Sequence, residues 1–446
     1  MAPARARARD SVFDAIALRS WLASTLASER RGGKHALEIL KHCAAFASRA
    51  DVDANASLRD IEWPRSTLAN DVRVSIADRF ELRTTRVAST STSRDGRTTK
   101  LLIALQDGHS IETCVMRHAR GRVTVCVSSQ VGCRMGCTFC ATGTLGELGN
   151  LTVGEMCEQV AHANAVLGVG NMRCRNVVFM GMGEPLNNYD AVIGACEVMR
   201  SAFGLAASKI TVSTVGVIPK MLTLARDAPG TGLALSLHAP TQELRQTIVP
   251  TATAYKLNDL MRALDEYLAS APKMKAMIEY CVLGGVNDDE TCAEQLGELL
   301  RGKEVILNLI PFNPTDTPAG HVPPKPEVVQ AMVKILTKKY DIFTTVRHTM
   351  GDDIDGACGQ LALKGHVESD IEDLMSVQKV KVKSTKTTAA KSTAVDTPSI
   401  SSPMESRAKW KLGASPTECA LLGVSVASAA LLMFSIFLRR ARRDAS

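Results

Sequence analysis

The stretch Gly132-Cys-Arg-Met-Gly-Cys-Thr-Phe-Cys140 places three cysteines in a C-x3-C-x2-C spacing. Structural zinc sites are closed by four ligands and usually contain paired C-x2-C units, but no second unit follows here. A 4Fe–4S cluster held by three cysteines keeps one iron open for another ligand. Cys133, Cys137 and Cys140 are therefore the expected ligands of such a cluster. A zinc site completed by a distant residue, or three buried thiols, are the alternatives.

Around this stretch, short apolar runs alternate with helical patterns as far as about Leu363. Six runs are predicted strands, over residues 123–127, 176–180, 209–212, 232–235, 277–282 and 305–310. The predicted helices between or after them cover residues 153–167, 188–203, 257–268, 293–300 and 326–338. Repeated βα units imply a parallel sheet, and six of them predict an α/β fold built as an open or partial (β/α)6 barrel.

Unusual residues follow the C-terminal ends of four of these strands. They are Gly183-Glu184, Ser213-Thr214, Ser236-Leu237-His238 and Asn313. Each has an ordinary structural explanation, such as a helix cap, a satisfied turn residue or a tight bend. Active sites of such barrels gather at this edge of the sheet, so the shared position predicts one site supplied by several strands.

Before the six strands, the sequence predicts a helical accessory region, a Ser/Thr/Arg-rich loop and a hairpin around Asp107-Gly108. The helices are expected over residues 12–27 and 34–47, the loop over 85–99, and the hairpin strands over 101–105 and 111–116.

The C-terminal part has a different composition. Residues 366–418 are rich in Lys, Ser, Thr and Ala and cannot bury a core, which predicts a disordered basic linker. From Cys419 to Leu438 there are 20 residues without a charge, enough to cross a bilayer as a transmembrane tail anchor. The expected domains are residues 1–90 (helical region), 91–365 (catalytic core), 366–418 (linker), 419–438 (anchor) and 439–446 (basic tail).

Composition limits the possible functions. The 446-residue chain is 45% hydrophobic, which is enough for a sizeable core, and its net charge of +7 permits a polyanionic partner. Thirteen scattered cysteines argue against a secreted disulfide scaffold. Arg5, Arg7 and Arg9 resemble an organellar transit peptide, whereas Asp10 and Asp14 favour an ordinary basic terminus.

Five sequence blocks occur in consistent order. They are Cys126-Val-Ser-Ser-Gln-Val-Gly-Cys133, Gly181-Met-Gly-Glu-Pro-Leu186, Ser236-Leu-His-Ala-Pro240, Leu309-Ile-Pro-Phe-Asn-Pro314 and Gly351-Asp-Asp-Ile-Asp-Gly-Ala-Cys-Gly-Gln360. Together they resemble the RlmN/Cfr family of RNA adenine methyltransferases, which are radical S-adenosylmethionine (SAM) enzymes. The resemblance implies a partial (β/α)6 barrel of the radical SAM type. It also implies two cofactors, SAM and a 4Fe–4S cluster whose open iron chelates SAM.

The resemblance further implies methylation of an RNA adenosine at C2 with two SAM molecules per turnover. One SAM methylates the thiol of Cys358. The other is cleaved to a 5′-deoxyadenosyl radical that removes hydrogen from this methyl group, and the resulting methylene radical adds to the adenine. In this scheme Cys126 resolves the covalent adduct by forming a disulfide, and Glu112 accepts the proton.

The same resemblance assigns residues to SAM and names partners. The implied SAM contacts are Gly183, Glu184, Ser213, Ser236, Leu237, His238 and Asn313. Cys114 and the other unmatched cysteines are expected to be structural. The implied partners are RNA, either ribosomal or transfer RNA, and an electron donor such as a flavodoxin or ferredoxin, with the protein acting as a monomer.

Two alternatives stay open. Methylation at C8 of the same nucleotide is a close rival, and nothing in the sequence separates it from C2. A membrane-tethered RNA-binding or metal-binding protein without turnover is the other, but it would have no need of Cys126 and Cys358. The catalytic domain is expected in the cytoplasm, tethered by the anchor, or in an organelle such as a plastid or mitochondrion if the N-terminus is a transit peptide.

Overall fold

The structure is a computed structural model that describes residues 3–26, 29–64, 69–168, 172–271 and 274–363. The chain divides into two units, residues 1–379 and 380–446, and every described residue belongs to the first unit. The predicted linker, anchor and basic tail, which begin at residue 366, lie outside the described residues.

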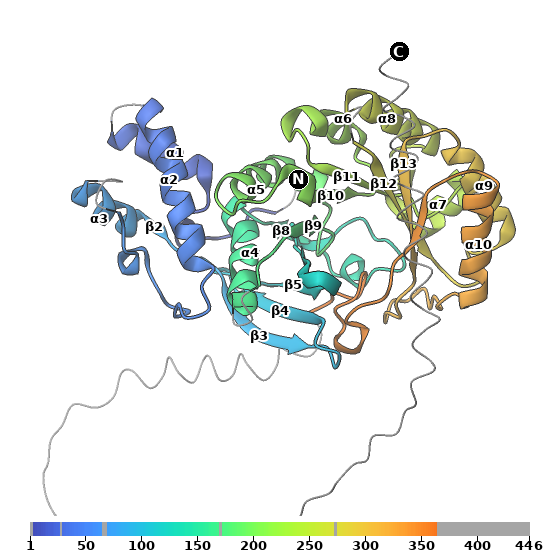
Figure 1. Ribbon diagram of the computed structural model, residues 1–446, viewed down its shortest axis with the longest axis horizontal. Coiled ribbons are helices and arrows are strands. Elements are labelled where there is room, and N and C mark those ends of the chain that lie inside the picture. The colour runs from blue at the N-terminus through green and yellow to red at the C-terminus, as the bar shows by residue number, and fades with distance from the viewer. Residues whose placement is uncertain (1–2, 27–28, 65–68, 169–171, 272–273, 364–446) are drawn as a thin grey trace, which may run out of the picture. The chain divides into compact units, whose positions relative to one another are not determined.

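A ten-stranded mixed sheet forms the centre of the described unit, in the order β14-β13-β12-β11-β10-β9-β6-β5-β4-β3 (Figure 1). Seven neighbouring strands run parallel to one another. They are β6 (Val123–Cys126), β9 (Asn176–Phe179), β10 (Ile210–Thr214), β11 (Gly232–Ser236), β12 (Ala276–Val282), β13 (Val305–Pro311) and β14 (Thr344–Val346). All six predicted strands are confirmed, and β14 is an additional strand that the sequence pattern did not indicate.

Three antiparallel strands extend the sheet beyond β6. They are β5 (Ser110–Arg117), β4 (Thr98–Ala104) and β3 (Arg86–Thr92). The predicted hairpin is confirmed as β4 and β5. The predicted loop over residues 85–99 is wrong, because most of it forms β3 and the start of β4. β3 lies at the edge of the sheet with alternating exposed and half-buried side chains, so its polar residues remain in contact with water.

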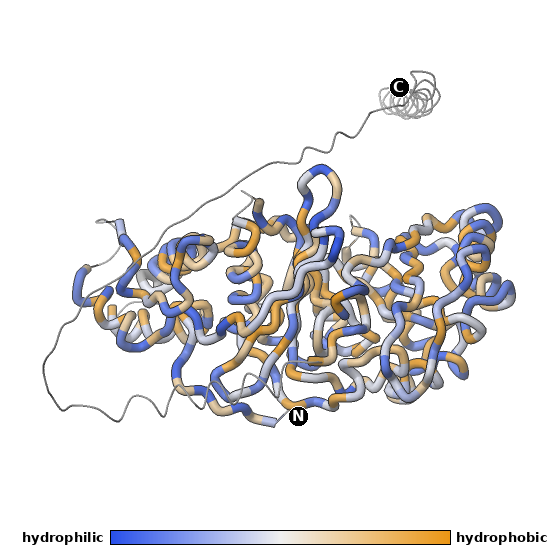
Figure 2. The backbone as a smooth tube through the Cα atoms, turned by 90° about the horizontal axis from the view of Figure 1, so that it is seen from below, coloured by the Kyte–Doolittle hydropathy of each residue, from blue (hydrophilic) through white to orange (hydrophobic). Residues whose placement is uncertain are grey.

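Helices connect the parallel strands as expected for βα units. They are α4 (Val153–Gly168), α5 (Tyr189–Ser201), α6 (Ile218–Asp227), α7 (Gln242–Ile248), α8 (Leu257–Ser270), α9 (Glu290–Leu300) and α10 (Pro326–Lys338). The five predicted helices are confirmed, whereas α6 and α7 were not predicted. The tube in Figure 2 shows that hydrophobic residues recur along strands and helices, and that many outer loops are hydrophilic. The predicted α/β fold, with a parallel sheet built from βα units, is therefore confirmed for the described unit.

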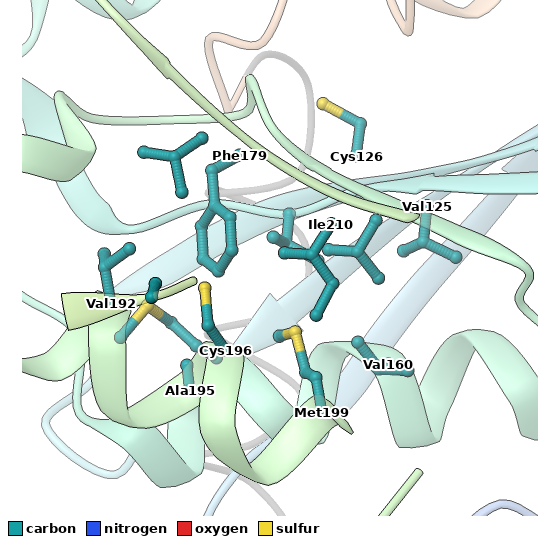
Figure 3. Close-up of a cluster of buried hydrophobic side chains, with 14 of the residues drawn as sticks. Val125, Cys126, Val160, Phe179, Val192, Ala195, Cys196, Met199 and Ile210 are labelled. Atoms are coloured by element: carbon teal, nitrogen blue, oxygen red, sulfur yellow. The ribbon is translucent and has the colours of Figure 1, made fainter. Parts of the chain in front are cut away.

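The main core lies between the sheet and the helices. Figure 3 shows the α5 side chains Val192, Ala195, Cys196 and Met199 beside Phe179 of β9 and Ile210 of β10. Val125 of β6 faces the same layer, whereas the thiol of the next residue, Cys126, points to the opposite face (Figure 3). Successive side chains of a strand alternate between faces. Packing of Val125 into the core therefore directs Cys126 away from the helices.

The N-terminal region contains α1 (Ala15–Thr25), α2 (Glu29–Ala47) and α3 (Asn70–Arg79). The two ends of this region are brought together by a short parallel pair of strands, β1 (Asp10–Ser11) and β2 (Phe80–Glu81). The helices predicted over residues 12–27 and 34–47 correspond to α1 and α2. Buried apolar residues of α1 and α2 belong to the same core cluster as those of α4 and α5.

The predicted fold class needs one correction, which concerns the membrane. Within residues 3–363, apart from the short gaps, no helix is long and apolar enough to cross a bilayer. A spanning helix needs about 20 predominantly apolar residues. α2 has 19 residues but carries Lys34, Glu38 and Lys41, and every other described α-helix has 16 residues or fewer. The transmembrane segment predicted over residues 419–438 lies outside the described residues, and the residues that the structure describes form an α/β fold in which no helix could span a membrane.

Candidate active site

A small hairpin holds the loop that carries the cysteine triplet. Cys133 ends β7 (Gln130–Cys133), which pairs with β8 (Gly146–Asn150) in a separate antiparallel sheet. Gly132 has φ +72°, and a Cβ there would lie 2.0 Å from the carbonyl oxygen of Gly146. Only glycine fits this conformation and this close approach of two backbones. The hairpin therefore fixes the backbone next to the first cysteine.

The loop then turns so that the three thiols lie near one another. The Cys140 amide donates to the Cys137 carbonyl at 3.0 Å, and the Gly143 amide donates to the Cys140 carbonyl at 3.0 Å. Burial raises the pKa of the Cys133 thiol to about 12, and the nearby Cys140 contributes in the same direction. Burial, Cys140 and Cys133 together hold the pKa of Cys137 well above its ordinary value. Cys140 thus makes ionisation of both Cys133 and Cys137 harder.

Gly183 and Glu184, which follow β9, shape the backbone at the end of that strand. Gly183 has φ +103°, and a Cβ there would lie 2.6 Å from the Cβ of Gln130. Glu184 is buried and accepts hydrogen bonds from the Leu186 amide at 3.0 Å and the Val215 amide at 2.9 Å. Burial raises the pKa of its carboxyl group, and these two amide bonds act against that shift. The Glu184 side chain therefore joins the ends of two neighbouring strands.

The residues at the C-terminal ends of β10 and β11 form a second group. The hydroxyls of Ser213 and Ser236 are hydrogen-bonded at 3.2 Å. His238 has φ +62°, its Nδ1 accepts from the Cys281 amide at 3.0 Å, and burial lowers its pKa to about 3. Its ring packs edge-on against Phe139 of the cysteine loop, with centroids 4.7 Å apart. The adjacent Leu237 is fully buried. His238 is thus a neutral, fixed side chain that links this strand end to the cysteine loop.

A cavity of about 380 Å³ opens beside these groups. It is lined by β5, β6, β9, β12 and β13 and by the segment of residues 347–361. Of the predicted SAM contacts, only Asn313 lines it. Asn313 donates through Nδ2 to the Cys358 carbonyl at 3.2 Å, and its Oδ1 accepts from the Thr349 hydroxyl at 2.9 Å. Asn313 therefore holds the segment that carries Cys358 against the end of β13.

Cys126 and Cys358, far apart in the sequence, both line this cavity. Burial raises the pKa of Cys126 to about 12, with Cys358 contributing, while the Arg347 guanidinium acts in the opposite direction. Burial also raises the pKa of Cys358, and Arg347 opposes this shift. All cysteines within the described part of the chain are free thiols. The disulfide expected between these two residues is therefore not found in this structure.

Glu112, the predicted proton acceptor, lies near the cavity but is absent from its lining. Its side chain is 2% exposed and forms an ion pair with Lys100 at 2.9 Å. The Leu363 amide also donates to its carboxylate, at 3.2 Å. Cys114, two residues further along β5 and on the same face of the strand, does line the cavity. Glu112 is thus a near neighbour of the wall that Cys126 and Cys358 share.

Sequence reasoning missed three residues of the cavity wall. Cys114 was expected to be structural, yet its thiol lines the cavity and donates to the Gly356 carbonyl at 3.2 Å. Glu279 and Arg347 were not singled out, although both line the cavity. Glu279 could have been recognised from the sequence, because it is a charged residue in the middle of an apolar strand. Arg347 left none, since a single arginine after a short strand is common.

Comparisons with known proteins agree with this geometry. Residues 127–294 match the family model described as the radical SAM superfamily. The chain is 45% identical over 273 residues to "Dual-specificity RNA methyltransferase RlmN 1" of Myxococcus xanthus, which covers 61% of this chain and 75% of the relative. It is 40% identical over 301 residues to "Probable dual-specificity RNA methyltransferase RlmN" of Bacillus subtilis, covering 67% and 82%.

The chain belongs to the RlmN/Cfr family of radical SAM RNA methyltransferases. A solved structure supports the same conclusion: the crystal structure of a radical SAM methyltransferase from Sphaerobacter thermophilus matches with a TM-score of 0.69 at 34% identity. The match covers 79% of this chain and 99% of that one. As a member of the RlmN/Cfr family, the protein is an enzyme whose cofactors are a 4Fe–4S cluster and SAM.

The donor groups of this RlmN/Cfr member fit a 4Fe–4S cluster. Within the described ranges, no three or more Cys, His, Asp or Glu side chains are grouped to hold a single metal ion. Zinc needs four such ligands at bonding distance from one point, whereas a four-iron cube is larger and needs only thiols around its edge. The cysteine loop supplies three neighbouring thiols. The buried guanidinium of Arg245 provides positive charge near Cys137 and opposes the raised pKa of that thiol.

Proposed function

We propose that this enzyme methylates an RNA adenosine at C2 through a methylated Cys358, with Cys126 as the resolving thiol. The observation that carries the proposal is that these two cysteines, from opposite ends of the catalytic domain, line one cavity. A thiol pair in a common cavity can exchange bonds through sulfur. The RNA substrate is inferred from the relatives, which are named as RNA methyltransferases.

The cysteine loop is the proposed cluster site, with Cys133, Cys137 and Cys140 as its three ligands. When bound there, the cluster and SAM supply a radical that removes a hydrogen atom from a methyl group. The cysteine loop is packed against the Cys358 segment, because the Ala141 amide donates to the Gly359 carbonyl at 2.7 Å. The two parts of the proposed site are therefore joined by a direct backbone contact.

Cys358 is proposed to accept a methyl group from SAM. Its thiol loses a proton, a new bond forms between its sulfur and the methyl carbon, and the bond between that carbon and the SAM sulfonium breaks. Asn313 holds the Cys358 carbonyl during this step. A thiol attacks as a thiolate, and Arg347 supplies the positive charge that favours ionisation against the effect of burial.

Cys126 is proposed to release the methylated base. The radical adduct would first return its unpaired electron to the oxidised cluster and lose the proton of the substituted adenine carbon. The Cys126 thiolate then attacks the Cys358 sulfur, and a disulfide forms. The bond from that sulfur to the methylene carbon breaks with its electron pair staying on carbon, which takes up a proton and becomes the new methyl group. Glu112 is the proposed acceptor of the proton that leaves the substituted adenine carbon. The Lys100 ammonium pairs with the Glu112 carboxylate at 2.9 Å and holds this side chain beside the cavity wall. A reducing thiol must then restore Cys126 and Cys358.

Basic side chains beside the cavity support an RNA substrate. Exposed arginines occupy the tips of two hairpins, namely Arg94 and Arg97 between β3 and β4, and Arg120 and Arg122 between β5 and β6. The tips are adjacent, because the Arg117 amide donates to the Arg97 carbonyl at 2.7 Å. Arg122 also lines the cavity. Arginine contacts to phosphates supply most sequence-independent affinity for nucleic acids.

The experiment is mass spectrometry of nucleosides from ribosomal and transfer RNA incubated with the reconstituted enzyme, SAM and a reductant. We expect 2-methyladenosine with the wild-type protein and with Cys196→Ala, a control that removes a thiol buried in the core (Figure 3). Cys358→Ala should form none. Formation of 8-methyladenosine would show that the enzyme acts at C8 instead, and no methyladenosine of either kind would refute the proposal.

A second variant separates the roles of the two thiols. Cys126→Ala should leave the radical adduct unresolved, so RNA stays covalently attached to the protein. Denaturing gels with labelled RNA would show a shifted band that is sensitive to ribonuclease. If Cys126→Ala turns over normally, Cys126 is not the resolving thiol.

A further inference from the structure

Two charged side chains of the cavity carry hydrogen-bonding groups that the methyl-transfer steps leave unused. One is Glu279, in the middle of β12, which is 2% exposed and lines the cavity. Its Oε2 accepts a hydrogen bond from the Asn308 amide group at 2.8 Å, but its Oε1 is buried with no partner. A buried carboxylate oxygen without a donor is costly and uncommon. Glu279, a residue of the cavity wall, therefore has one unused acceptor oxygen.

Arg347 presents the complementary group. Within the described residues its guanidinium forms no ion pair, and its contacts are the sulfur atoms of Met180 at 3.8 Å and Met116 at 3.9 Å. A guanidinium has five N–H donors, and thioethers are weak acceptors. The charges of Arg347 and Glu279 act on each other's pKa, yet no hydrogen bond or ion pair joins these two described side chains. The cavity thus holds an acceptor and a donor that a ligand can bridge.

The position of Glu279 is fixed before any ligand arrives. Asn308, on the neighbouring strand β13, donates to Glu279 and accepts through Oδ1 from the Thr345 hydroxyl at 3.0 Å. The backbone of Arg347 is held in turn, because its amide donates to the Leu309 carbonyl at 2.8 Å. Three neighbouring strand segments therefore set the spacing between the two charges, as a recognition site requires.

We propose that Glu279 and Arg347 recognise the target adenine of the RNA. Adenine presents an amino donor at position 6 beside a ring-nitrogen acceptor, N1 or N7. Glu279 Oε1 accepts from the 6-amino group and the Arg347 guanidinium donates to the adjacent ring nitrogen. Met116 and Met180 provide apolar contact for the ring. Guanine carries an oxygen at position 6, which the Glu279 carboxylate repels, so the pair selects adenine by attraction and by exclusion.

SAM also contains an adenine ring, but the position of the pair favours the target base. Most of the residues implied as SAM contacts lie outside this cavity, including Ser213, Ser236 and His238. Glu279 and Arg347 share the cavity with Cys126 and Cys358 instead. The inference rests on the proposed function, since it assigns the base that these thiols modify.

The test exchanges one group of the substrate and one of the protein. RNA oligonucleotides carry either adenosine or purine riboside, which lacks the 6-amino group, at the target position. We expect the wild-type enzyme to prefer adenosine by about 10- to 100-fold in kcat/KM, the range for a lost hydrogen bond to a charged group. Glu279→Gln should methylate adenosine about 10- to 100-fold more slowly and should discriminate less than about threefold between the two substrates.

Matched variants and the affinity for SAM separate recognition of the target base from a general loss of activity. Glu294→Gln makes the same chemical change on the outer helix α9, where Glu294 pairs with Lys339, and should behave as wild type. The Kd for SAM, measured without RNA, should change less than about twofold in Glu279→Gln. A large rise in that Kd would assign the pair to the adenine of SAM and overturn the inference. Arg347→Lys should lose adenosine methylation while keeping the SAM Kd.

The remaining outcomes are also decisive. If wild-type enzyme methylates neither substrate, the proposed function fails and the inference falls with it. If wild-type enzyme methylates adenosine and Glu279→Gln keeps the full preference over purine riboside, the inference alone is wrong. Circular dichroism and iron content of each variant show whether a loss reflects unfolding. Should Glu279→Gln not fold, Arg347→Lys is subjected to the same substrate comparison.

Discussion

Two buried carboxylates, one on a helix and one on a strand, differ in how completely they are bonded. Glu158 of α4 accepts from the amides and hydroxyls of Thr84 and Thr85 and from the Ser11 hydroxyl, so both of its oxygens are fully used. Glu279 of β12, which lines the cavity, keeps one oxygen without a partner. A buried carboxyl group whose oxygens are all hydrogen-bonded stabilises the contact between the segments it joins, whereas one with an unused oxygen is available to a ligand. The contacts of Glu158 with Ser11, Thr84 and Thr85 are called the Glu158 junction here. Substitutions at this junction should therefore reduce stability, and substitutions in the cavity should reduce activity.

The largest effect is expected in the cavity. Cys358→Ala should lower methylation by at least about 10³-fold, because no other group can carry the methyl. The midpoint of urea unfolding should stay within the error of wild type, since Cys358 is only partly buried. Iron content should be unchanged. If Cys358→Ala lowers the midpoint of urea unfolding as well as the methylation rate, Cys358 also stabilises the fold, and the contrast with the Glu158 junction is wrong.

The strongest effect on stability is expected at the junction. Glu158→Ala leaves the Thr84 and Thr85 amides without their acceptor, and the free energy of unfolding should fall by about 2–5 kcal/mol. Below the unfolding transition, methylation per folded molecule should remain within about twofold of wild type. Urea unfolding followed by circular dichroism measures the first quantity, and nucleoside analysis measures the second. Loss of activity in the fully folded variant would show that the junction also controls the cavity.

A smaller effect on activity is expected at Asn313. Asn313→Ala removes the hydrogen bonds to the Cys358 carbonyl and the Thr349 hydroxyl. Methylation of Cys358 should slow by roughly tenfold, because the segment that carries the thiol is less well held. The increase in mass of the Cys358 peptide over time measures this step without RNA. A normal rate would mean that other contacts suffice to position Cys358.

The smallest effect concerns pH. Burial raises the pKa of Glu158 to about 7 from an ordinary value near 4.5, although its hydrogen bonds act against the shift. The folded state therefore binds more protons than the unfolded state between these values. The contribution of Glu158 to the free energy of unfolding is fully present below about pH 4.5. It declines as the pH rises through 7, by at most about 1.4 kcal/mol per pH unit.

Urea unfolding at about pH 5, 6 and 7 measures this decline. Glu158→Gln should abolish it, whereas Glu304→Gln, on the surface, should retain the wild-type profile. A profile in Glu158→Gln that is as steep as in wild type would assign the pH dependence to another group.

The parts of this molecule that are local in the sequence could be predicted from it. The cysteine loop is one short stretch, and the six parallel strands are apolar runs that a helix follows. β3 was interpreted as a loop, because an edge strand keeps polar side chains in water and loses the apolar signal. The short helices α6 and α7 were missed because each gives too few turns for a clear periodicity. These errors concern elements with little buried surface.

The cavity could be predicted only in part. Cys126 and Cys358 were identified through resemblance to a family. Glu279, Arg347 and Cys114 could not be placed together from the sequence, because their proximity depends on the order of strands in the sheet. In the sheet, β6 lies between β5 and β9, although β7, β8 and α4 separate β6 from β9 in the chain. Glu112 was singled out for a role, but its ion pair with Lys100 depends on the register of β4 and β5.

The place of β6 in the sheet sets which sulfur can move. β6 is hydrogen-bonded to antiparallel β5 on one side and to parallel β9 on the other, so its backbone is held along both edges. Cys358 instead belongs to a segment beyond the last strand, held by isolated contacts such as the Asn313 side chain and the backbone hydrogen bond from Ala141 to Gly359. In a reaction that joins the two sulfurs, we therefore expect Cys126 to stay in place and the segment that carries Cys358 to move. The rate of each catalytic cycle would then depend on the movement of that segment rather than on the sheet.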